Sequence, residues 1–222
     1  MNEQSGPLLD SSELPLPERL ALTYAAPGVR TMLHAGFAFD RKLERVVRQA
    51  NEPILAQMKL AWWRDRLREE AAARPKGDPL LDALGREWNG REVALISLVD
   101  GWEATLGAAS RKGLGEFAKG RALLMQAWAD AAGASDDAET VKIEARRWSY
   151  GDAAAAAGET EARELAMELE SELPRRARLT RALRPLAILA GLAERSIAAG
   201  GVRAVEDRGA MLAAMRIALL GR

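Results

Sequence analysis

Apolar residues recur at intervals of three and four positions along almost the whole chain, and no stretch of strand length alternates apolar and polar residues. This spacing places apolar side chains on one face of an α-helix and is the main sequence signal for that structure. Alanine, the strongest helix former, is abundant, and β-branched residues are sparse. The pattern therefore predicts an all-α protein, and the absence of a fixed repeat favours a globular bundle over a solenoid.

Prolines, glycines and loop-forming stretches divide this pattern into nine or so helices with short connections. Asp78 lies in the clearest loop and is expected to cap the helix that follows it. Residues 1–16 are expected to form a flexible segment ahead of one domain over residues 17–222. The expected helices cover residues 17–24, 29–50, 53–73, 80–88, 92–106, a segment that Gly113-Leu114-Gly115 separates and that reaches Trp128, a segment through Trp148, residues 161–173, a long helix interrupted by Pro185, and about 205–220.

The charge and cysteine content exclude several functions. The 32 Lys and Arg residues balance 32 Asp and Glu residues, so the basic excess of a nucleic-acid-binding protein is missing. There is no cysteine and only one histidine, His34, which excludes disulfides, thiolate zinc sites and a cysteine nucleophile. What remains is at most a metal site made of carboxylates, and such a site suits Mg²⁺.

The first sixteen residues, Met1 to Leu16, are polar and acidic and do not have the pattern of a signal peptide. No window of membrane-spanning length is free of charge. We therefore expect a cytoplasmic protein.

The most distinctive stretch runs from Glu52 to Asp65 and contains the adjacent tryptophans Trp62 and Trp63. Neighbouring helical residues point about 100° apart, so one ring enters the core while the other lies at a seam between helices. The alternative interpretation is that both tryptophans serve packing alone, which is the usual role of this residue.

A second stretch, residues 37–48, carries Asp40 and Glu44 four positions apart. This spacing places two carboxylates on one helix face, where they can hold a divalent cation. Opposite charges at the same spacing also form solvated ion-pair faces, and both interpretations stay open. The arginines that accompany the two carboxylates are Arg41, Arg45 and Arg48.

A third stretch places five arginines between Arg175 and Arg184, ahead of the apolar residues 186–192. Such a run can attract a diphosphate or an anionic membrane surface. The alternative is an exposed face in front of a core helix that is kinked at Pro185.

Taken together, these segments resemble the squalene/phytoene synthase family. In members of this family, a helix that starts with an aromatic residue, Ala and Phe is followed by an Arg/Lys-Leu-x-Trp-Trp-Arg segment, at the separation found here. The resemblance implies a single orthogonal all-α bundle of the isoprenoid (terpenoid) synthase type over residues 17–222. The segments that carry it are ERLALTYA at 18–25, FAFDRKLERVV at 37–47 and EPILAQMKLAWWRD at 52–65, with weaker matches at 95–107 and 173–192.

The chain departs from this family at the residues that carry the chemistry. Catalytic members have two motifs of the form D-x-x-x-D, whose carboxylates hold the Mg²⁺ ions that bind the diphosphate and help it leave. Here the first motif begins with Glu44 but continues with Arg45 and Arg48. The second motif offers Asp152 without a paired aspartate. An arginine cannot bind Mg²⁺, and its charge repels the ion.

The resemblance also implies which residues would form the site of an active member. Metal ligands would be Asp40, Glu44 and Asp152. Substrate-binding residues would be Arg41 and Arg48 near the diphosphate, and Trp62 and Trp63 at the floor of the cavity.

Three functions follow from these observations. The favoured one is a degenerate family member without normal Mg²⁺-dependent turnover, which binds isoprenoids or acts as an assembly factor, as one branch of relatives does for respiratory complex I. The alternative is an active prenyltransferase that uses Mg²⁺ and joins two prenyl diphosphates head to head in squalene, hopanoid or carotenoid synthesis. In the third, only the fold is shared. The expected partners are a prenyl diphosphate or lipid, an unidentified protein and the surface of the inner membrane, but no nucleic acid.

Overall fold

The computed structural model describes residues 10–134, 136–202 and 216. Regular structure in these residues consists of α-helices and two short 3₁₀-helices, without a strand, which confirms the all-α prediction. The 3₁₀-helices are η1 (Ser11–Glu13) and η2 (Arg181–Leu183). The α-helices are α1 (Leu16–Thr23), α2 (Pro27–Arg48), α3 (Pro53–Arg68), α4 (Pro79–Glu87), α5 (Glu92–Glu103), α6 (Arg111–Ala131), α7 (Ala138–Ala156), α8 (Thr160–Ser171) and α9 (Arg184–Ala198).

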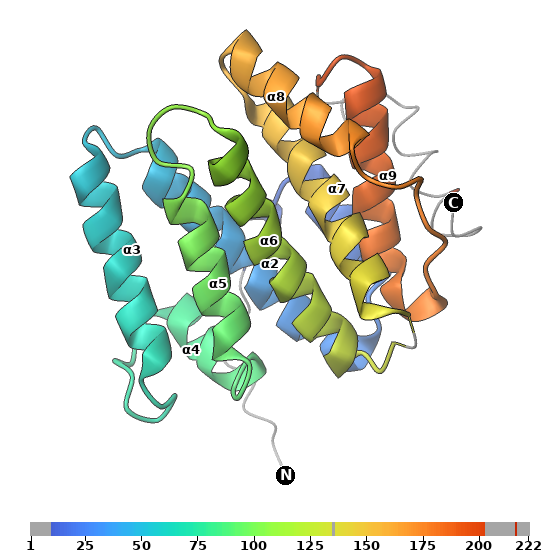
Figure 1. Ribbon diagram of the computed structural model, residues 1–222. Coiled ribbons are helices and arrows are strands. Elements are labelled where there is room, and N and C mark those ends of the chain that lie inside the picture. The colour runs from blue at the N-terminus through green and yellow to red at the C-terminus, as the bar shows by residue number, and fades with distance from the viewer. Residues whose placement is uncertain (1–9, 135, 203–215, 217–222) are drawn as a thin grey trace.

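Five helices form a layer in the order α3, α5, α6, α7 and α9, with each helix packed against the next (Figure 1). The long helix α2 crosses behind this layer and contacts α3, α4, α5 and α6. Its side chains Phe37 and Phe39 are fully buried, and Phe37 meets the edge of the Trp148 ring on α7. The core therefore lies between α2 and the layer, and α3 forms one edge of the layer.

The helices α7 and α9 pack against each other at Gly151. A Cβ atom at this position would lie 2.7 Å from Cα of Ala193 and 3.0 Å from its carbonyl oxygen. Backbone atoms cannot move away as a side chain can, so the sequence needs glycine here for the two helices to meet.

Two predicted helix ends, those of α2 and α3, need correction. The predicted break between the first two helices is present, since α1 ends at Thr23, but α2 begins at Pro27 and not near Val29. In the first helical position the missing N–H of proline leaves no hydrogen bond unmade. The helix α3 ends at Arg68 and not near residue 73. Its last carbonyl groups are satisfied by the Arg74 side chain, which donates to the backbone oxygens of Leu67 at 3.2 Å and Glu69 at 2.9 Å.

The start of α6 also differs from the prediction. Gly113-Leu114-Gly115 predicts a separation between helices, but α6 begins at Arg111 and runs through both glycines. The side chain of Ser110 caps it by accepting a hydrogen bond of 3.1 Å from the Gly113 N–H. Gly113 is required because a Cβ there would collide with the Ala104 carbonyl oxygen.

The helix around Pro185 is shorter than predicted, because it begins only at Arg184. Residues 172–180 are not helical, and Pro185 lies in the first turn of α9, where it interrupts nothing. The helix expected over about 205–220 lies outside the described residues except for Arg216. Within the segment expected to be flexible, residues 10–16 are described, and there Leu14 is buried in the core.

None of the helices in the described ranges could span a bilayer, since each is too short or too polar.

Candidate functional site

Five charged side chains from four helices meet in the interior of the bundle. Arg121 is fully buried, and only 1% of Glu18 and of Asp40 is exposed. Charged groups are rarely buried unless they are paired, so this concentration marks the most unusual part of the molecule. The buried charge cluster consists of the buried residues Glu18 on α1, Asp40 and Arg41 on α2 and Arg121 on α6, together with Asp152 on α7, whose side chain is 19% exposed.

Arg121 occupies the centre of this cluster. Its Nη2 lies 2.7 Å from Oδ2 of Asp40, and its Nη1 lies 2.9 Å from Oδ2 of Asp152. The guanidinium plane also lies against the rings of Phe117 and Trp148, with centroid distances of 4.5 and 4.3 Å. Cation–π contacts of this kind gain strength where water is excluded. Arg121 therefore joins α2 and α7 through charge and is enclosed by aromatic rings.

Arg41 makes a second junction beside the first. Its Nη1 donates to Oε2 of Glu44 at 2.7 Å, and its Nη2 donates to Oδ2 of Asp152 at 3.0 Å and to Glu18. Outside the cluster, Arg48 donates to the other oxygen of Glu44 at 2.8 Å. Asp152 thus receives two guanidinium groups, one from α2 and one from α6.

The remaining oxygen of Asp40 is satisfied by a tryptophan. The indole N–H of Trp102 on α5 donates to Oδ1 of Asp40 at 2.8 Å. Trp102 in turn meets the ring of Phe117 edge to face at a centroid distance of 4.7 Å. Trp102 therefore donates a hydrogen bond to the cluster, and the rings of Phe117 and Trp148 shield Arg121 from solvent.

The charges of the cluster shift the pKa values of its members and of the neighbouring Glu44. Burial alone would raise the pKa of Asp152, but the charges of Arg41 and Arg121 outweigh it and hold this pKa well below its usual range. The pKa of Glu44 is lowered because Arg41 similarly outweighs burial. Burial acts against both guanidinium groups, yet the surrounding carboxylates raise the pKa of Arg41 and of Arg121. Both arginines and Asp152 are therefore charged near neutral pH.

The squalene/phytoene synthase family model matches residues 19–147. This segment is more than half of the chain and extends from α1 into α7. The chain belongs to the squalene/phytoene synthase family. Neither the curated proteins nor the solved structures gave a match. The matched segment contains Asp40, Arg41 and Arg121 and ends before Asp152.

The carboxylates in and next to the cluster do not fit the Mg²⁺ ions on which catalytic members of this family depend. Asp40, Glu44 and Asp152 do come together, but Arg121 lies between Asp40 and Asp152, and Arg41 lies between Asp152 and Glu44. In the described part of the chain, no group of three or more acidic, histidine or cysteine side chains is arranged to hold a metal ion. The guanidinium groups already contact the oxygens that a metal would need, and they add positive charge.

The two tryptophans of the family segment lie away from the buried charge cluster. Trp63 is buried and meets the Phe39 ring edge to face at 5.1 Å, whereas 43% of Trp62 is exposed. Both line a groove of about 710 Å³ between α2 and α3, together with Lys42, Arg45 and Lys59. The expected substrate-binding residues are thus separated in the structure: Trp62 and Trp63 line this groove, Arg41 belongs to the cluster, and Arg48 lies just outside the cluster on Glu44.

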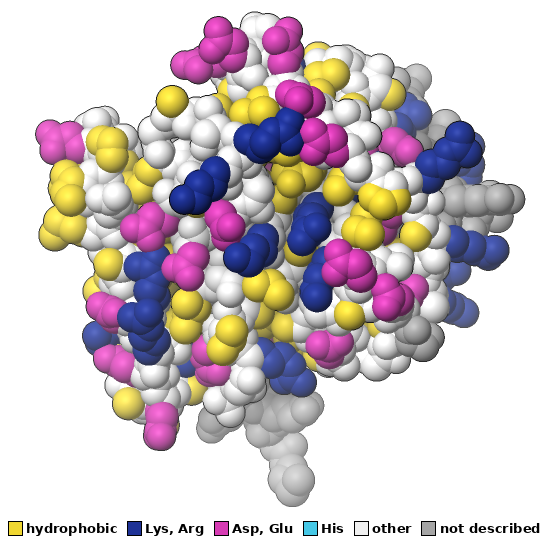
Figure 2. All heavy atoms as spheres, in the orientation of Figure 1, with side chains coloured by type: hydrophobic (Ala, Val, Ile, Leu, Met, Phe, Trp, Pro, Cys, Tyr) yellow, Lys and Arg dark blue, Asp and Glu magenta, His cyan; other side chains and the backbone are white. Residues whose placement is uncertain are grey.

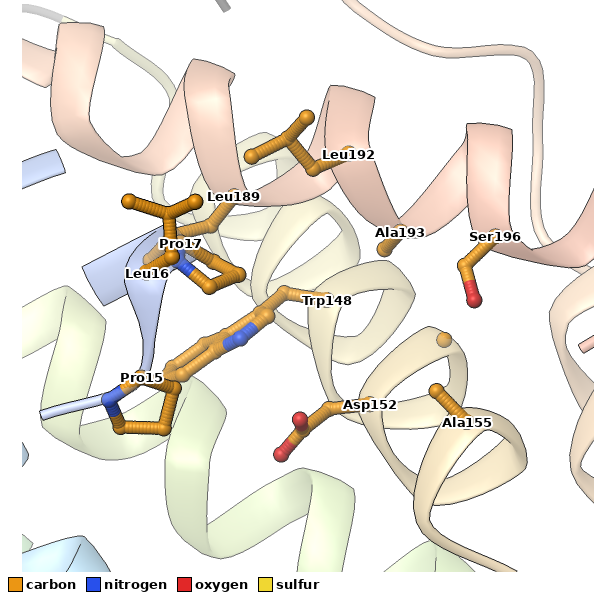
Figure 3. Close-up of a pocket in the computed structure, with 11 residues that line it drawn as sticks. Pro15, Leu16, Pro17, Trp148, Asp152, Ala155, Leu189, Leu192, Ala193 and Ser196 are labelled. Carbon is orange, nitrogen blue, oxygen red and sulfur yellow. The ribbon is translucent and has the colours of Figure 1, made fainter. Parts of the chain in front are cut away.

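Two small cavities flank Asp152 on either side. One, of about 190 Å³, lies between the start of α1, α7 and α9 and is mostly apolar (Figure 3). In that view the carboxylate of Asp152 points away from α9, while Leu189 and Leu192 of α9 line the cavity together with Trp148. The other, of about 200 Å³, is lined by Glu44, Arg48 and the opposite side of Asp152. Both are smaller than the roughly 300 Å³ at which pockets for drug-sized ligands begin.

Glu18 and Arg121 are not among the site residues that the sequence predicts. Arg121 does carry a recognisable signal, because it is a single charge on a helix face that is otherwise apolar from Phe117 to Trp128. Such a residue predicts a buried ion pair, but the identity of its partners cannot be obtained from helix periodicity.

Glu18 allows a test of the electrostatics through pH. Burial raises its pKa above the ordinary value of 4.5, although the charge of Arg41 opposes this. When the pKa of an acid is raised in the folded state, the folded protein holds the proton more tightly than the unfolded chain does. The contribution of this group to the free energy of unfolding is therefore complete below the unfolded pKa and is lost as pH rises through the folded pKa. We therefore expect the melting temperature of Glu18→Gln to improve relative to wild type as pH rises above about 4.5, because glutamine cannot ionise.

The measurement is thermal unfolding of both proteins across a series of pH values. An exposed carboxylate provides the matched control, and Glu116→Gln should give a curve parallel to that of the wild type. A difference between Glu18→Gln and wild type that stays constant with pH would contradict the raised pKa.

Proposed function

We propose that this member of the squalene/phytoene synthase family does not carry out Mg²⁺-dependent condensation, and instead acts as an isoprenoid-binding protein or assembly factor. The observation that carries the proposal is the position of Arg41 and Arg121, whose guanidinium groups lie between the carboxylates that would have to bind Mg²⁺. Bound metal would have to displace two buried, paired guanidinium groups, and breaking such pairs costs about 3–5 kcal/mol.

The size of the cavities supports the same proposal. An apolar cavity of about 150 Å³ holds a molecule the size of benzene, so the cavity of 190 Å³ beside Trp148 suits one isoprene unit or the end of a longer chain. Two complete prenyl diphosphates need far more room. Trp102, Phe117 and Trp148 fill the space next to Arg121.

The proposed setting is the cytoplasm, with a prenyl diphosphate or other lipid as the ligand and a protein partner in the assembly role. In the isoprenoid-binding role, Arg48 is half exposed beside the second cavity and is the cation best placed to meet a diphosphate. Mg²⁺ has no role in either case.

The proposal is tested by titration calorimetry with a non-hydrolysable analogue of farnesyl diphosphate, with and without Mg²⁺, and by an assay for diphosphate release from farnesyl diphosphate. We expect no Mg²⁺-dependent release and no effect of Mg²⁺ on binding. Binding that is weakened in Arg48→Gln but not in Arg68→Gln, whose arginine is exposed on α3, would support the isoprenoid-binding role.

Absence of binding would favour the assembly role and direct the search to the protein partner. Diphosphate release that requires Mg²⁺ would overturn the proposal and establish the alternative, an active prenyltransferase.

A further inference from the structure

The outer face of α3 exposes an unusual number of large hydrophobic side chains. In the ranges that the structure describes, four of the six large hydrophobic residues that are exposed belong to this one helix. Their positions in the sequence place them along one flank of about two turns. Figure 2 shows hydrophobic side chains gathered at the edge of the molecule where α3 lies. The α3 ridge consists of Ile54, Leu55, Met58 and Trp62, which are 55, 46, 65 and 43% exposed.

The fold does not need this ridge. The opposite flank of α3 supplies the core contacts through Ala56, Leu60, Trp63 and Leu67, all buried. A surface helix needs only one apolar stripe to pack on its domain, so a second apolar stripe that faces water marks a site for another surface.

A basic groove runs beside the ridge and indicates the charge of that surface. The groove of about 710 Å³ between α2 and α3 is lined by Lys42, Arg45 and Lys59 and contains Trp62, against a single carboxylate, Asp78. Across the described residues, Lys42 and Lys59 form no ion pair with a carboxylate. Arg45 has only an exposed contact of 3.4 Å with Glu13. The groove is therefore positive and available to an anionic group.

We propose that α3 docks this protein on an anionic lipid bilayer. The ridge inserts into the boundary between headgroups and acyl chains, and Lys42 and Lys59 contact lipid phosphates. An exposed helix flank with Ile, Leu, Met and Trp beside lysines has the composition of an interfacial membrane helix, in which Trp takes the headgroup level. Lysines near the surface of an anionic leaflet add to the attraction.

The arginine run at residues 175–184 is a weaker membrane surface. Arg175, Arg178 and Arg181 are exposed there, but the leucines among them, Leu179 and Leu183, are buried. That segment therefore offers charge without side chains that could insert. The docking proposal is independent of the proposed function, because it uses neither the cavities nor the buried charge cluster.

The test is co-sedimentation of the full chain with vesicles of phosphatidylcholine alone or mixed with phosphatidylglycerol. We expect binding to the mixed vesicles only, and weaker binding as salt is added. The double variant Ile54→Ser, Met58→Ser should lose at least about tenfold in affinity, because two exposed apolar side chains no longer insert. The control Val93→Ser removes an apolar side chain that is 77% exposed on another helix and should bind like the wild type.

Two further measurements identify the surface. Lys42→Gln with Lys59→Gln should weaken binding about tenfold or more, whereas Arg175→Gln with Arg178→Gln should not. The chain has no cysteine, so Met58→Cys provides a unique position for a fluorophore that reports entry into an apolar environment, with Val93→Cys as its control.

Several outcomes would overturn the proposal. These are no binding to mixed vesicles, equal binding by the ridge variant, loss of binding only in the arginine variants, or the same fluorescence change at residues 58 and 93. Selective binding of an acidic amphipathic helix without binding to vesicles would assign the ridge to a protein partner instead. Circular dichroism checks that each variant keeps its helices, which is expected because the substituted side chains do not belong to the core.

Discussion

Replacement of Arg121 by methionine should lower the free energy of unfolding by about 3–5 kcal/mol, the usual cost of removing one partner from a buried ion pair. Methionine fills much of the volume against Phe117 and Trp148, so the loss reports mainly on charge. The variant leaves Asp40 buried without its guanidinium partner, and it removes one of the two that Asp152 has. Urea denaturation followed by circular dichroism measures the change.

Arg111 provides the matched control for this experiment. It also pairs with two carboxylates, Glu168 and Glu172, but all three side chains are at least half exposed. Arg111→Met should therefore lower the free energy of unfolding far less than Arg121→Met does, because solvent screens exposed ion pairs. If Arg121→Met lost no more stability than Arg111→Met, or if added Mg²⁺ restored the stability of Arg121→Met, the carboxylates would not need the guanidinium group as a partner. Either result would also reopen the question of a metal site.

The second large effect is expected at the contact between α7 and α9. Gly151→Ala places a methyl group against the backbone of Ala193, which must shift, and we expect a loss of about 1–3 kcal/mol in the free energy of unfolding. Gly115 on α6 provides a control because a Cβ there would meet no atom within 4 Å. Gly115→Ala should therefore stabilise the protein by about 0.4–1 kcal/mol through helix propensity. Equal effects of the two substitutions would contradict the close packing.

The elements of the fold follow from the sequence because helix periodicity is a local property. Asp78 illustrates this, since its carboxylate accepts from the N–H groups of Leu80 and Leu81 as its place before an apolar helix predicts. The errors arise where a distant group decides the local structure. Gly113 lies inside α6 because Ser110 caps the helix ahead of it. It is a glycine because the Ala104 carbonyl group leaves no room for a Cβ atom, and this contact between α6 and the end of α5 cannot be seen in the local sequence.

The candidate site could be predicted only in part for the same reason. The motif positions point to Glu44 and Asp152, helix spacing adds Asp40, and the structure brings these three carboxylates together. The group between Asp40 and Asp152 is Arg121. It is 81 residues beyond Asp40 in the sequence, and no motif links it to these carboxylates. A pattern can indicate that carboxylates converge, but whether they meet a metal or a guanidinium depends on how the helices pack.

The buried charge cluster also bears on how the chain is made in the cell. Its members are spread from α1 to α7, and synthesis proceeds from the N-terminus. Before α7 has left the ribosome, Arg41 has Glu18 and Glu44 as partners and Arg121 has Asp40, but both still lack Asp152, the carboxylate that they share. We therefore expect the first six helices to assemble around an incomplete cluster, which gains the carboxylate shared by its two arginines only when α7 arrives.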